Sequence, residues 1–220
     1  MDESNPRAPT RATRHALLTL PELAAMLLAL NSTAFAKDIS PIPANESILG
    51  VTQVELTKNW WRWAASFPQN SGPIADRTGA QCGKGQRGDV WFLAGAYGSQ
   101  RVTRTCHVPA GKTLFFPLIN FVMYWQRPNY DCKELILDAA SATNRPSALI
   151  LEIDGMRFFD LDSHRLATDC FSLAPDRPPA VAANGYYIAI RPPSKGKHVF
   201  NFGGILPDIT QAITYTIIVE

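Results

Sequence analysis

The chain has 220 residues, of which 46% are hydrophobic and 18% are charged, a composition that suits a buried core and excludes intrinsic disorder. Its 21 Lys and Arg residues against 19 Asp and Glu residues leave a net charge of +2, which excludes a strongly basic surface for nucleic acid. The 17 prolines and 14 glycines indicate many turns, which favours short strands over long helices.

The N-terminal segment has the organisation of a signal peptide. Three arginines between residues 7 and 14 precede an apolar stretch, whose cleanest part is residues 23–30. Ala34 and Ala36 then supply the small-x-small pattern that signal peptidase cleaves. The apolar stretch is shorter than the roughly 20 residues that span a bilayer. We therefore predict a signal peptide over residues 1–36, a secreted or periplasmic protein, and no integral membrane span after cleavage.

All four cysteines follow the predicted cleavage site, and they are Cys82, Cys106, Cys132 and Cys170. Four cysteines allow three pairings. We predict Cys82–Cys106 and Cys132–Cys170, because the first two flank a single predicted hairpin. None belongs to a C-x-x-C pair, so we expect neither a zinc site nor a thioredoxin-like site. Disulfides agree with export to an oxidising compartment.

Residues 37–50 are rich in Pro, Ser and Asn and predict an extended leader before a domain of residues 51–220. A helix is predicted at the start of this domain, because Thr52 and Glu55 have the spacing of a capping box. Its tryptophans are Trp60, Trp61 and Trp63. Adjacent helical positions point about 100° apart, so we expect two indoles to pack on the domain and the third to stay half exposed.

Beyond an irregular loop at residues 69–86, the apolar residues follow the period of β-strands. Strands are predicted over residues 90–94, 102–108, 113–119, 148–153, 156–160, 186–190, 198–202 and 212–219. The first two are predicted to form a hairpin through residues 95–99. Asp154-Gly155 predicts a second hairpin, because this dipeptide suits a type I′ turn. A short helix is possible near residues 133–142.

These elements predict a mostly β fold. Eight short strands at intervals of about ten residues indicate a single two-sheet β-sandwich of jelly-roll or immunoglobulin-like type. One N-terminal amphipathic helix and the short helix near residues 133–142 accompany the sheets. The sequence shows no repeat of fixed period, which disfavours a propeller or a solenoid.

Four strings occur in order along the chain. They are WWxW from Trp60, GQxGxVWFLAG from Gly85, VTRxCxVPAGK from Val102 and LFFPxxN from Leu114. Together they resemble a group of uncharacterised secreted bacterial proteins. The resemblance covers residues 55–120 and implies an exported protein. It implies no activity and no catalytic or ligand-binding residue.

The sequence offers no recognisable catalytic motif, since it lacks a G-x-S-x-G elbow, a P-loop and an H-E-x-x-H pair. Four acids are available for glycoside hydrolysis, namely Asp89, Glu152, Asp160 and Asp162, but their spacing does not show which of them face each other. Arg104 stands in an apolar strand, where we expect a buried or edge salt bridge. The catalytic residues of an enzyme stay unknown at this point.

Metal binding is not expected. The histidines of the predicted mature chain are His107, His164 and His198, and isolated histidines on strands are more often structural than ligating. Asp160 and Asp162, with Asp169 nearby, offer oxygen ligands for calcium, but a solvated turn after the hairpin is the favoured interpretation. We predict no metal site and no cofactor.

The aromatic, polar segment over residues 124–131 is the best candidate for recognition. Its candidate ligand-binding residues are Tyr124, Trp125, Arg127, Asn129 and Tyr130. Flat aromatic faces stack on sugar rings, and the polar side chains between them hydrogen-bond hydroxyls. The alternative is a hydrophobic loop that packs against the sandwich beside Cys132.

Three functions from different classes follow. The favoured one is a secreted, non-catalytic binding module, with a glycan or another small molecule as its partner. The second is an extracellular hydrolase or lyase whose carboxylates or histidines meet only in the fold. The third is a structural or interaction protein of the cell envelope.

Overall fold

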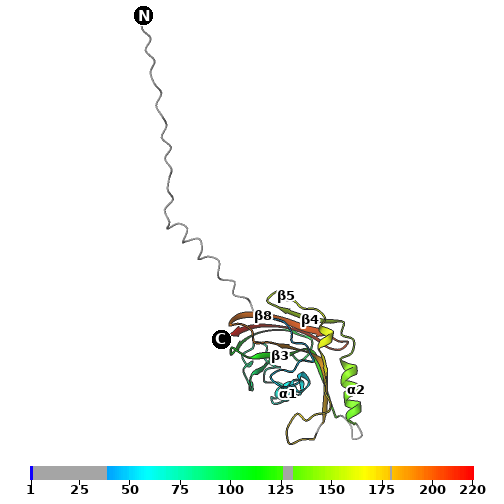
Figure 1. Cartoon of the computed structure of the whole chain (residues 1–220). Coiled ribbons are helices and arrows are strands. Elements are labelled where there is room, and N and C mark those ends of the chain that lie inside the picture. Colours follow the sequence, from blue (N-terminus) through cyan, green and yellow to red (C-terminus); the bar gives the residue numbers. More distant parts are fainter. Residues whose placement is uncertain (2–38, 126–130, 179) are drawn as a thin grey trace. The chain divides into compact units, whose positions relative to one another are not determined.

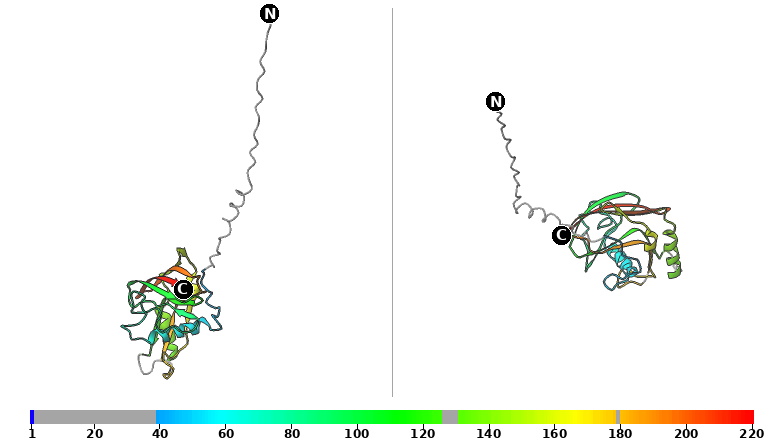
Figure 2. Two further views of the ribbon diagram at one scale, coloured as in Figure 1. Left: turned by 90° about the vertical axis from the view of Figure 1, so that its left-hand side faces the viewer. Right: turned by 45° about the horizontal axis from the view of Figure 1, so that its top comes forward.

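The computed structural model describes residues 1, 39–125, 131–178 and 180–220. The predicted signal peptide, apart from Met1, lies outside these residues. From residue 39 onward the chain forms stacked layers, with a five-stranded sheet on one face of a four-stranded sheet and helix α1 on the other (Figure 1, Figure 2). No helix in the described ranges is long and apolar enough to cross a membrane.

The mostly β, two-sheet sandwich is confirmed. The helical elements are α1 (Gln53–Ala65), α2 (Cys132–Ala142) and the 3₁₀ helix η1 (Leu161–His164). The four-stranded sheet has the order β1 (Val90–Phe92), β3 (Thr113–Tyr124), β7 (Val181–Ile190) and β6 (Arg165–Ala167). The five-stranded sheet has the order β2 (Arg101–Val108), β9 (Thr210–Val219), β8 (Gly196–Ile205), β4 (Ala148–Ile153) and β5 (Met156–Arg157).

The predicted hairpin between the first two strands is wrong. β1 pairs in parallel with β3, whereas β2 pairs in parallel with β9 in the opposite sheet. The glycine-bearing turn at residues 95–99 therefore carries the chain from one sheet to the other. Turn residues show that a chain changes direction, but they do not show which strand it then pairs with. These parallel edge pairs also depart from the all-antiparallel pairing of a jelly roll.

The second hairpin is confirmed. Ile153 pairs with Met156, so two residues connect β4 to β5. Asp154 has φ +52° and Gly155 has φ +81°, which are the two left-handed positions of a type I′ turn. Glycine adopts such an angle without a steric cost, and aspartate is among the side chains that tolerate it.

Both predicted disulfides are present, Cys82–Cys106 and Cys132–Cys170. The reason given for the first pair does not hold, because no hairpin lies between its two cysteines. Cys82 instead belongs to the irregular loop at residues 69–86 and ties that loop to the edge strand β2.

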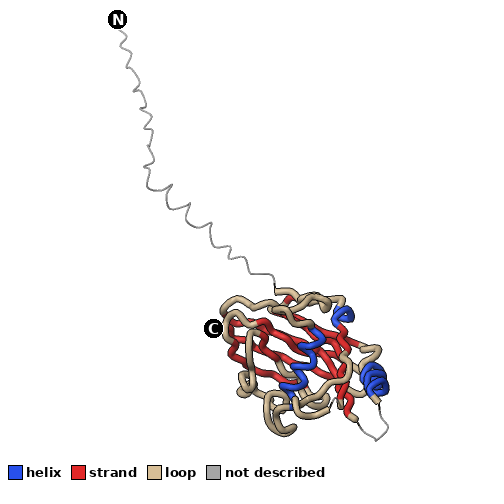
Figure 3. The backbone as a smooth tube through the Cα atoms, turned by 60° about the horizontal axis from the view of Figure 1, so that its bottom comes forward, coloured by secondary structure: helices blue, strands red, loops and turns tan. Residues whose placement is uncertain are grey.

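Helix α1 begins after Thr52, whose side-chain hydroxyl accepts a hydrogen bond from the Glu55 N–H. The Glu55 carboxylate forms an ion pair with Arg62, 2.9 Å away. Trp60 and Trp63 are 2% and 7% exposed, while Trp61 is partly buried. Two indoles thus pack on the sheet and one stays partly open, which agrees with the predicted number. The face is not the expected one, because residues 54 and 65, which share the helical spacing of Trp61, are not buried. Figure 3 shows α1 lying across the strands of the sheet.

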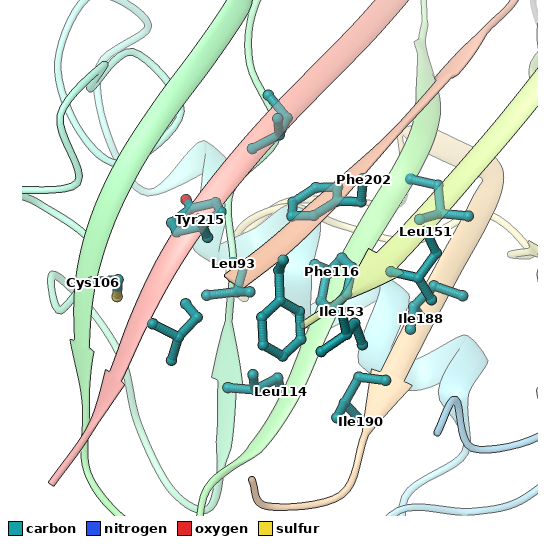
Figure 4. Close-up of a cluster of buried hydrophobic side chains, with 14 of the residues drawn as sticks. Leu93, Cys106, Leu114, Phe116, Leu151, Ile153, Ile188, Ile190, Phe202 and Tyr215 are labelled. Atoms are coloured by element: carbon teal, nitrogen blue, oxygen red, sulfur yellow. The ribbon is translucent and has the colours of Figure 1, made fainter. Parts of the chain in front are cut away.

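Two hydrophobic cores separate the layers. Between the sheets lie side chains such as Leu114, Phe116 and Ile188, with Phe202 and Tyr215 from the facing sheet (Figure 4). The core beneath α1 includes Phe115, Tyr187 and Ala189 together with Trp60 and Trp63. Strands β3 and β7 alternate between the two cores because neighbouring residues of a strand point to opposite faces. These two strands are therefore apolar on both faces.

A β-bulge in β3 changes which of its side chains point into the core between the sheets. Its register against β7 shifts between Pro117 and Ile119, so Leu118 is an extra residue on this strand. Phe116 points into the core between the sheets, and with strict alternation Asn120 would point there too. The extra residue places Ile119 in that core instead. Asn120 therefore faces the side of the sheet that carries α1.

Candidate functional site

Two adjoining hollows lie beside α1 along residues 119–124 of β3. Their volumes are about 540 Å³ and 180 Å³, and Trp61, Ile74, Tyr97 and Asn120 line both. The larger hollow is also lined by Ala64, Ala65, Phe67, Gln69, Phe121, Val122, Tyr124 and Leu173. The smaller hollow is also lined by Trp60, Gly95, Ala96, Gly98, Ser99, Ile119, Asp208, Ile209 and Gln211. We call the two hollows together the aromatic cleft.

Trp61 forms the wall of the cleft that belongs to α1. Its indole N–H donates to the Tyr187 hydroxyl over 2.9 Å, and its ring meets the edge of the Trp60 ring at 5.0 Å. Trp60 is anchored in turn, because its own N–H donates to the Leu93 carbonyl over 3.0 Å. These contacts hold the Trp61 ring in one orientation at the cleft.

Asn120 lies at the junction of the two hollows. Its side-chain amide is within hydrogen-bond distance of the Tyr187 hydroxyl, 3.0 Å from Nδ2 to Oη. The residue paired with it on β7 is Gly185, where an added Cβ would lie 2.6 Å from both Cα and Cβ of Asn120. No side chain fits in that space. The bulge and this glycine together place the Asn120 amide in the cleft.

Gln211, from the opposite sheet, holds the bulge in place. Its side-chain amide donates to the carbonyls of Leu118 and Pro117, 2.7 Å and 3.3 Å away. Its Oε1 accepts from the Ala96 N–H over 3.1 Å. The same side chain therefore connects β9, the bulge of β3 and the loop that carries Tyr97.

Arg104 anchors the wall opposite α1. The expected salt bridge is wrong, because every hydrogen bond of this buried guanidinium goes to a neutral oxygen. Its acceptors are the carbonyls of Ile74, Asp76, Ala94 and Gly95, at 2.7–3.1 Å, and the Tyr215 hydroxyl at 3.0 Å. Two loops that reach the cleft are thus tied to strand β2. A planar fork with five N–H donors suits several acceptors at once.

The aromatic cleft is close to electrically neutral. Burial raises the pKa of Tyr97 and of Tyr124, and the charge of ionised Tyr97 would raise that of Tyr124 further. Burial likewise raises the pKa of Tyr187. The phenols are therefore uncharged near neutral pH. Among the described residues, Asp208 is the charged side chain that lines the cleft.

The predicted recognition residues meet different outcomes. Tyr124 is the last residue of β3 rather than the start of a loop, and it lines the cleft with 47% of its surface exposed. Trp125 is 48% exposed, its backbone N–H donates to the Ala180 carbonyl, and it is not among the residues that line the cleft. Arg127, Asn129 and Tyr130 lie outside the described residues. The sequence analysis missed Trp61 and Asn120 as site residues and did not consider Tyr97, which is 49% exposed.

The three histidines lie in separate environments. His107 lies 3.4 Å from a carboxylate oxygen of Glu220, His164 is buried on η1, and His198 pairs with Asp154 at 2.7 Å. Across the described ranges, no three His, Cys, Asp or Glu side chains form a group that could hold a metal ion. Asp169, considered above for calcium, is paired with Lys58 at 2.7 Å.

Ser194, His198 and Asp154 resemble the composition of a catalytic triad. His198 Nδ1 lies 2.7 Å from the Asp154 carboxylate, and Nε2 lies 3.4 Å from the Ser194 hydroxyl. The same Nε2 is closer to the Ser194 carbonyl oxygen, at 2.9 Å. The Ser194 carbonyl oxygen therefore competes with the Ser194 hydroxyl for the hydrogen bond of Nε2. Through these contacts His198 connects the Asp154-Gly155 turn to the segment before β8.

None of the four acids considered for glycoside hydrolysis is among the described residues that line the cleft. Asp89 forms an ion pair with Lys112 at 3.0 Å. Glu152 accepts a hydrogen bond from Asn201 on the outer face of the five-stranded sheet. Asp160 and Asp162 lie at η1, where the Asp160 carbonyl accepts from Ser163. Asp208 is thus the one acid among the described residues that line the cleft, so these residues supply no pair of carboxylates.

Comparison with known proteins leaves the family of the chain open. No protein-family model matches the sequence, and no curated protein matches it. Among solved structures, PbICP-C in complex with falcipain-2 is similar over 60% of this chain and 100% of its own, with 12% identity and a TM-score of 0.28. Amebosin is similar over 56% of this chain and 98% of its own, with 10% identity and a TM-score of 0.20. Neither similarity bears on function.

Proposed function

We propose that the protein is an exported, non-catalytic binding module that holds a neutral glycan in the aromatic cleft. The observation that carries this proposal is the meeting of Trp61, Tyr97 and Tyr124 around the Asn120 amide. Three aromatic side chains supply flat apolar faces, and the amide supplies hydrogen bonds between them. Sugar rings present this combination of an apolar face and a polar rim.

The charge of the cleft favours a neutral ligand. Asp208 is the one acidic side chain among its described lining residues, so a uronic acid or a phosphorylated sugar would meet a like charge. A neutral oligosaccharide meets no such repulsion. The uncharged phenols of the cleft add hydroxyl groups that both donate and accept hydrogen bonds.

Export is supported by the disulfides and by the N-terminal sequence. Two disulfides use all four cysteines, which agrees with an oxidising compartment outside the cytoplasm. A site on the surface of such a protein is exposed to the polysaccharides of cell walls and of the surroundings.

The test is retention of the purified protein on a panel of insoluble polysaccharides, with soluble oligosaccharides followed by calorimetry. We expect at least one neutral glycan to bind and no new reducing ends to appear. Tyr97→Ala and Tyr124→Ala should each weaken binding about tenfold, which corresponds to about 1.4 kcal/mol per lost aromatic contact. Reducing ends that accumulate with time would instead establish a hydrolase.

Two further variants locate the contact. Phe159→Ala removes an exposed aromatic on the segment after β5 and should leave binding unchanged. Trp125→Ala tests the loop proposed from the sequence, and we expect a smaller loss than for Tyr124→Ala because Trp125 is not among the residues that line the cleft. The proposed site would be contradicted if both Tyr97→Ala and Tyr124→Ala bound the glycan as tightly as the unmodified protein does.

A further inference from the structure

We infer that the cleft selects sugars that carry an acetamido group, and that the side-chain amide of Asn120 is the group that recognises it. This inference rests on the proposed glycan function and names the class of sugar. The geometry that carries it is the hydrogen-bond chain from Trp61 through Tyr187 to Asn120, which ends at the junction of the two hollows.

The orientation of the Asn120 amide follows from a count of protons. The Tyr187 hydroxyl is fully buried and accepts from the Trp61 indole, which is a donor only. Among the described residues, its other hydrogen-bond partner is the Asn120 amide. If that amide also donated, the hydroxyl proton would be buried without an acceptor. The structure has Nδ2 of Asn120 toward Tyr187. The oxygen and nitrogen of an amide have nearly the same shape, so exchanging their positions leaves the side chain in place and turns Oδ1 toward Tyr187, which is the arrangement that we infer.

This orientation leaves the NH₂ group of Asn120 facing the cleft. Tyr187 then donates to Oδ1 and accepts from Trp61, and both of its hydrogen-bonding functions are satisfied. The two N–H donors of Asn120 then face the cleft, where a ligand can accept from them. A ligand therefore has to bring a strong acceptor to this point, and a carbonyl oxygen is such an acceptor.

The smaller hollow fits the remainder of an acetamido group. Its volume of about 180 Å³ is small, and Ile74, Ile119 and Ile209 line it together with Ala96. These apolar side chains suit a methyl group. Asp208 lines the same hollow, where its carboxylate is available to accept the N–H of the acetamido group. The aromatic walls of the larger hollow then take the sugar rings.

The experiment compares two neutral trisaccharides that differ only at C2. Triacetylchitotriose carries an acetamido group on each ring, and cellotriose carries a hydroxyl there. Both are titrated into the unmodified protein by calorimetry. We expect the acetylated sugar to bind at least tenfold more tightly, because the hydroxyl sugar leaves the Asn120 donors without their carbonyl partner. A glucosamine oligomer is not a suitable comparison, because its ammonium groups would be attracted to Asp208.

Asn120→Asp tests the residue itself. The carboxyl group keeps the shape of the amide and an acceptor for Tyr187, but it removes the NH₂ donors. We expect the preference for triacetylchitotriose to fall to about twofold or less. Asn59→Asp makes the same charge change on α1 outside the cleft and should keep the preference. Thermal unfolding of each variant separates lost recognition from lost folding.

The outcomes are distinguishable. Equal affinity of the unmodified protein for both sugars would overturn the inference and leave the glycan function standing. A preference that persists in folded Asn120→Asp would overturn the role of Asn120. Failure of every polysaccharide in the panel to bind would remove the proposed function itself. The comparison on the unmodified protein decides the sugar class even if the variant does not fold.

Discussion

Arg104 illustrates how one side chain organises a site that it does not line. Its guanidinium is buried in β2 and donates to carbonyls of two loops, so its hydrogen bonds go to peptide groups rather than to a carboxylate. The Asp76 carboxyl lies near it. Burial alone would raise the pKa of Asp76, but N–H donors of Gln81 and Thr78 and the charge of Arg104 together lower it. The arrangement keeps Ile74 and Tyr97 at the cleft.

The first prediction concerns this residue. Arg104→Lys keeps the charge but replaces five fixed donors with three on one nitrogen, so several buried carbonyls lose their partner. We expect the free energy of unfolding to fall by about 3 kcal/mol. Urea unfolding measures the change. Arg101→Lys, an exposed position on the same strand, is the control and should change stability by less than about 0.5 kcal/mol. Equal losses in the two variants would show that the carbonyl contacts contribute nothing.

At the scale of elements, the bulge of β3 is the feature that creates the site. The strand is 12 residues long and changes facing at Leu118, which brings Asn120 to the same side as Trp61. A bulge leaves backbone groups without their ladder partners, and here Gln211 supplies partners from the opposite sheet. Cleft and sandwich core are therefore coupled through one glutamine.

The second prediction tests this coupling. Gln211→Leu keeps the size of the side chain but removes the donor to the Pro117 and Leu118 carbonyls and the acceptor for the Ala96 N–H. We expect a loss of about 2–3 kcal/mol in unfolding free energy. Glycan binding should weaken at a temperature where the variant is still folded. Gln100→Leu, at an exposed position, is the control. Unchanged binding by folded Gln211→Leu would mean that the bulge does not position Asn120.

At the scale of the whole molecule, the disulfides join segments that the sheets leave loose. Cys82–Cys106 ties the loop at residues 69–86 to β2, and that loop carries Ile74 and Gln69 of the cleft. Cys132–Cys170 ties the start of α2 to the segment between β6 and β7. The first bridge is therefore expected to stabilise the fold and to hold part of the cleft in place, whereas the second is expected to stabilise the fold alone.

The third prediction separates these two roles. The bridges span 24 and 38 residues, for which the loss of chain entropy in the unfolded state gives about 3–4 kcal/mol each. Replacement of either pair by serines should lower stability by a similar amount. We expect glycan binding by the folded protein to weaken only when Cys82 and Cys106 are replaced. Each pair serves as the control for the other, and equal effects on binding would contradict the assignment.

Local sequence signals predicted the elements whose causes are local. Helix α2 was expected near residues 133–142 and spans Cys132–Ala142, with Asp131 and Glu134 forming its capping box. The Asp154-Gly155 turn was predicted by type, because two left-handed residues are a property of the dipeptide itself. The number and spacing of short strands likewise predicted the two-sheet sandwich.

The sequence by itself therefore determined the fold class, the presence of two disulfides, and the packing of two of the three α1 tryptophans. Only the tertiary structure decided that β1 and β2 lie in different sheets, that Arg104 binds carbonyls, and that Asn120 leaves the core. The physical reason is the separation along the chain of the residues that interact. Caps and turns depend on residues within a few positions, whereas Gly185, Tyr187 and Gln211 act on Asn120 or its bulge from more than 60 residues away.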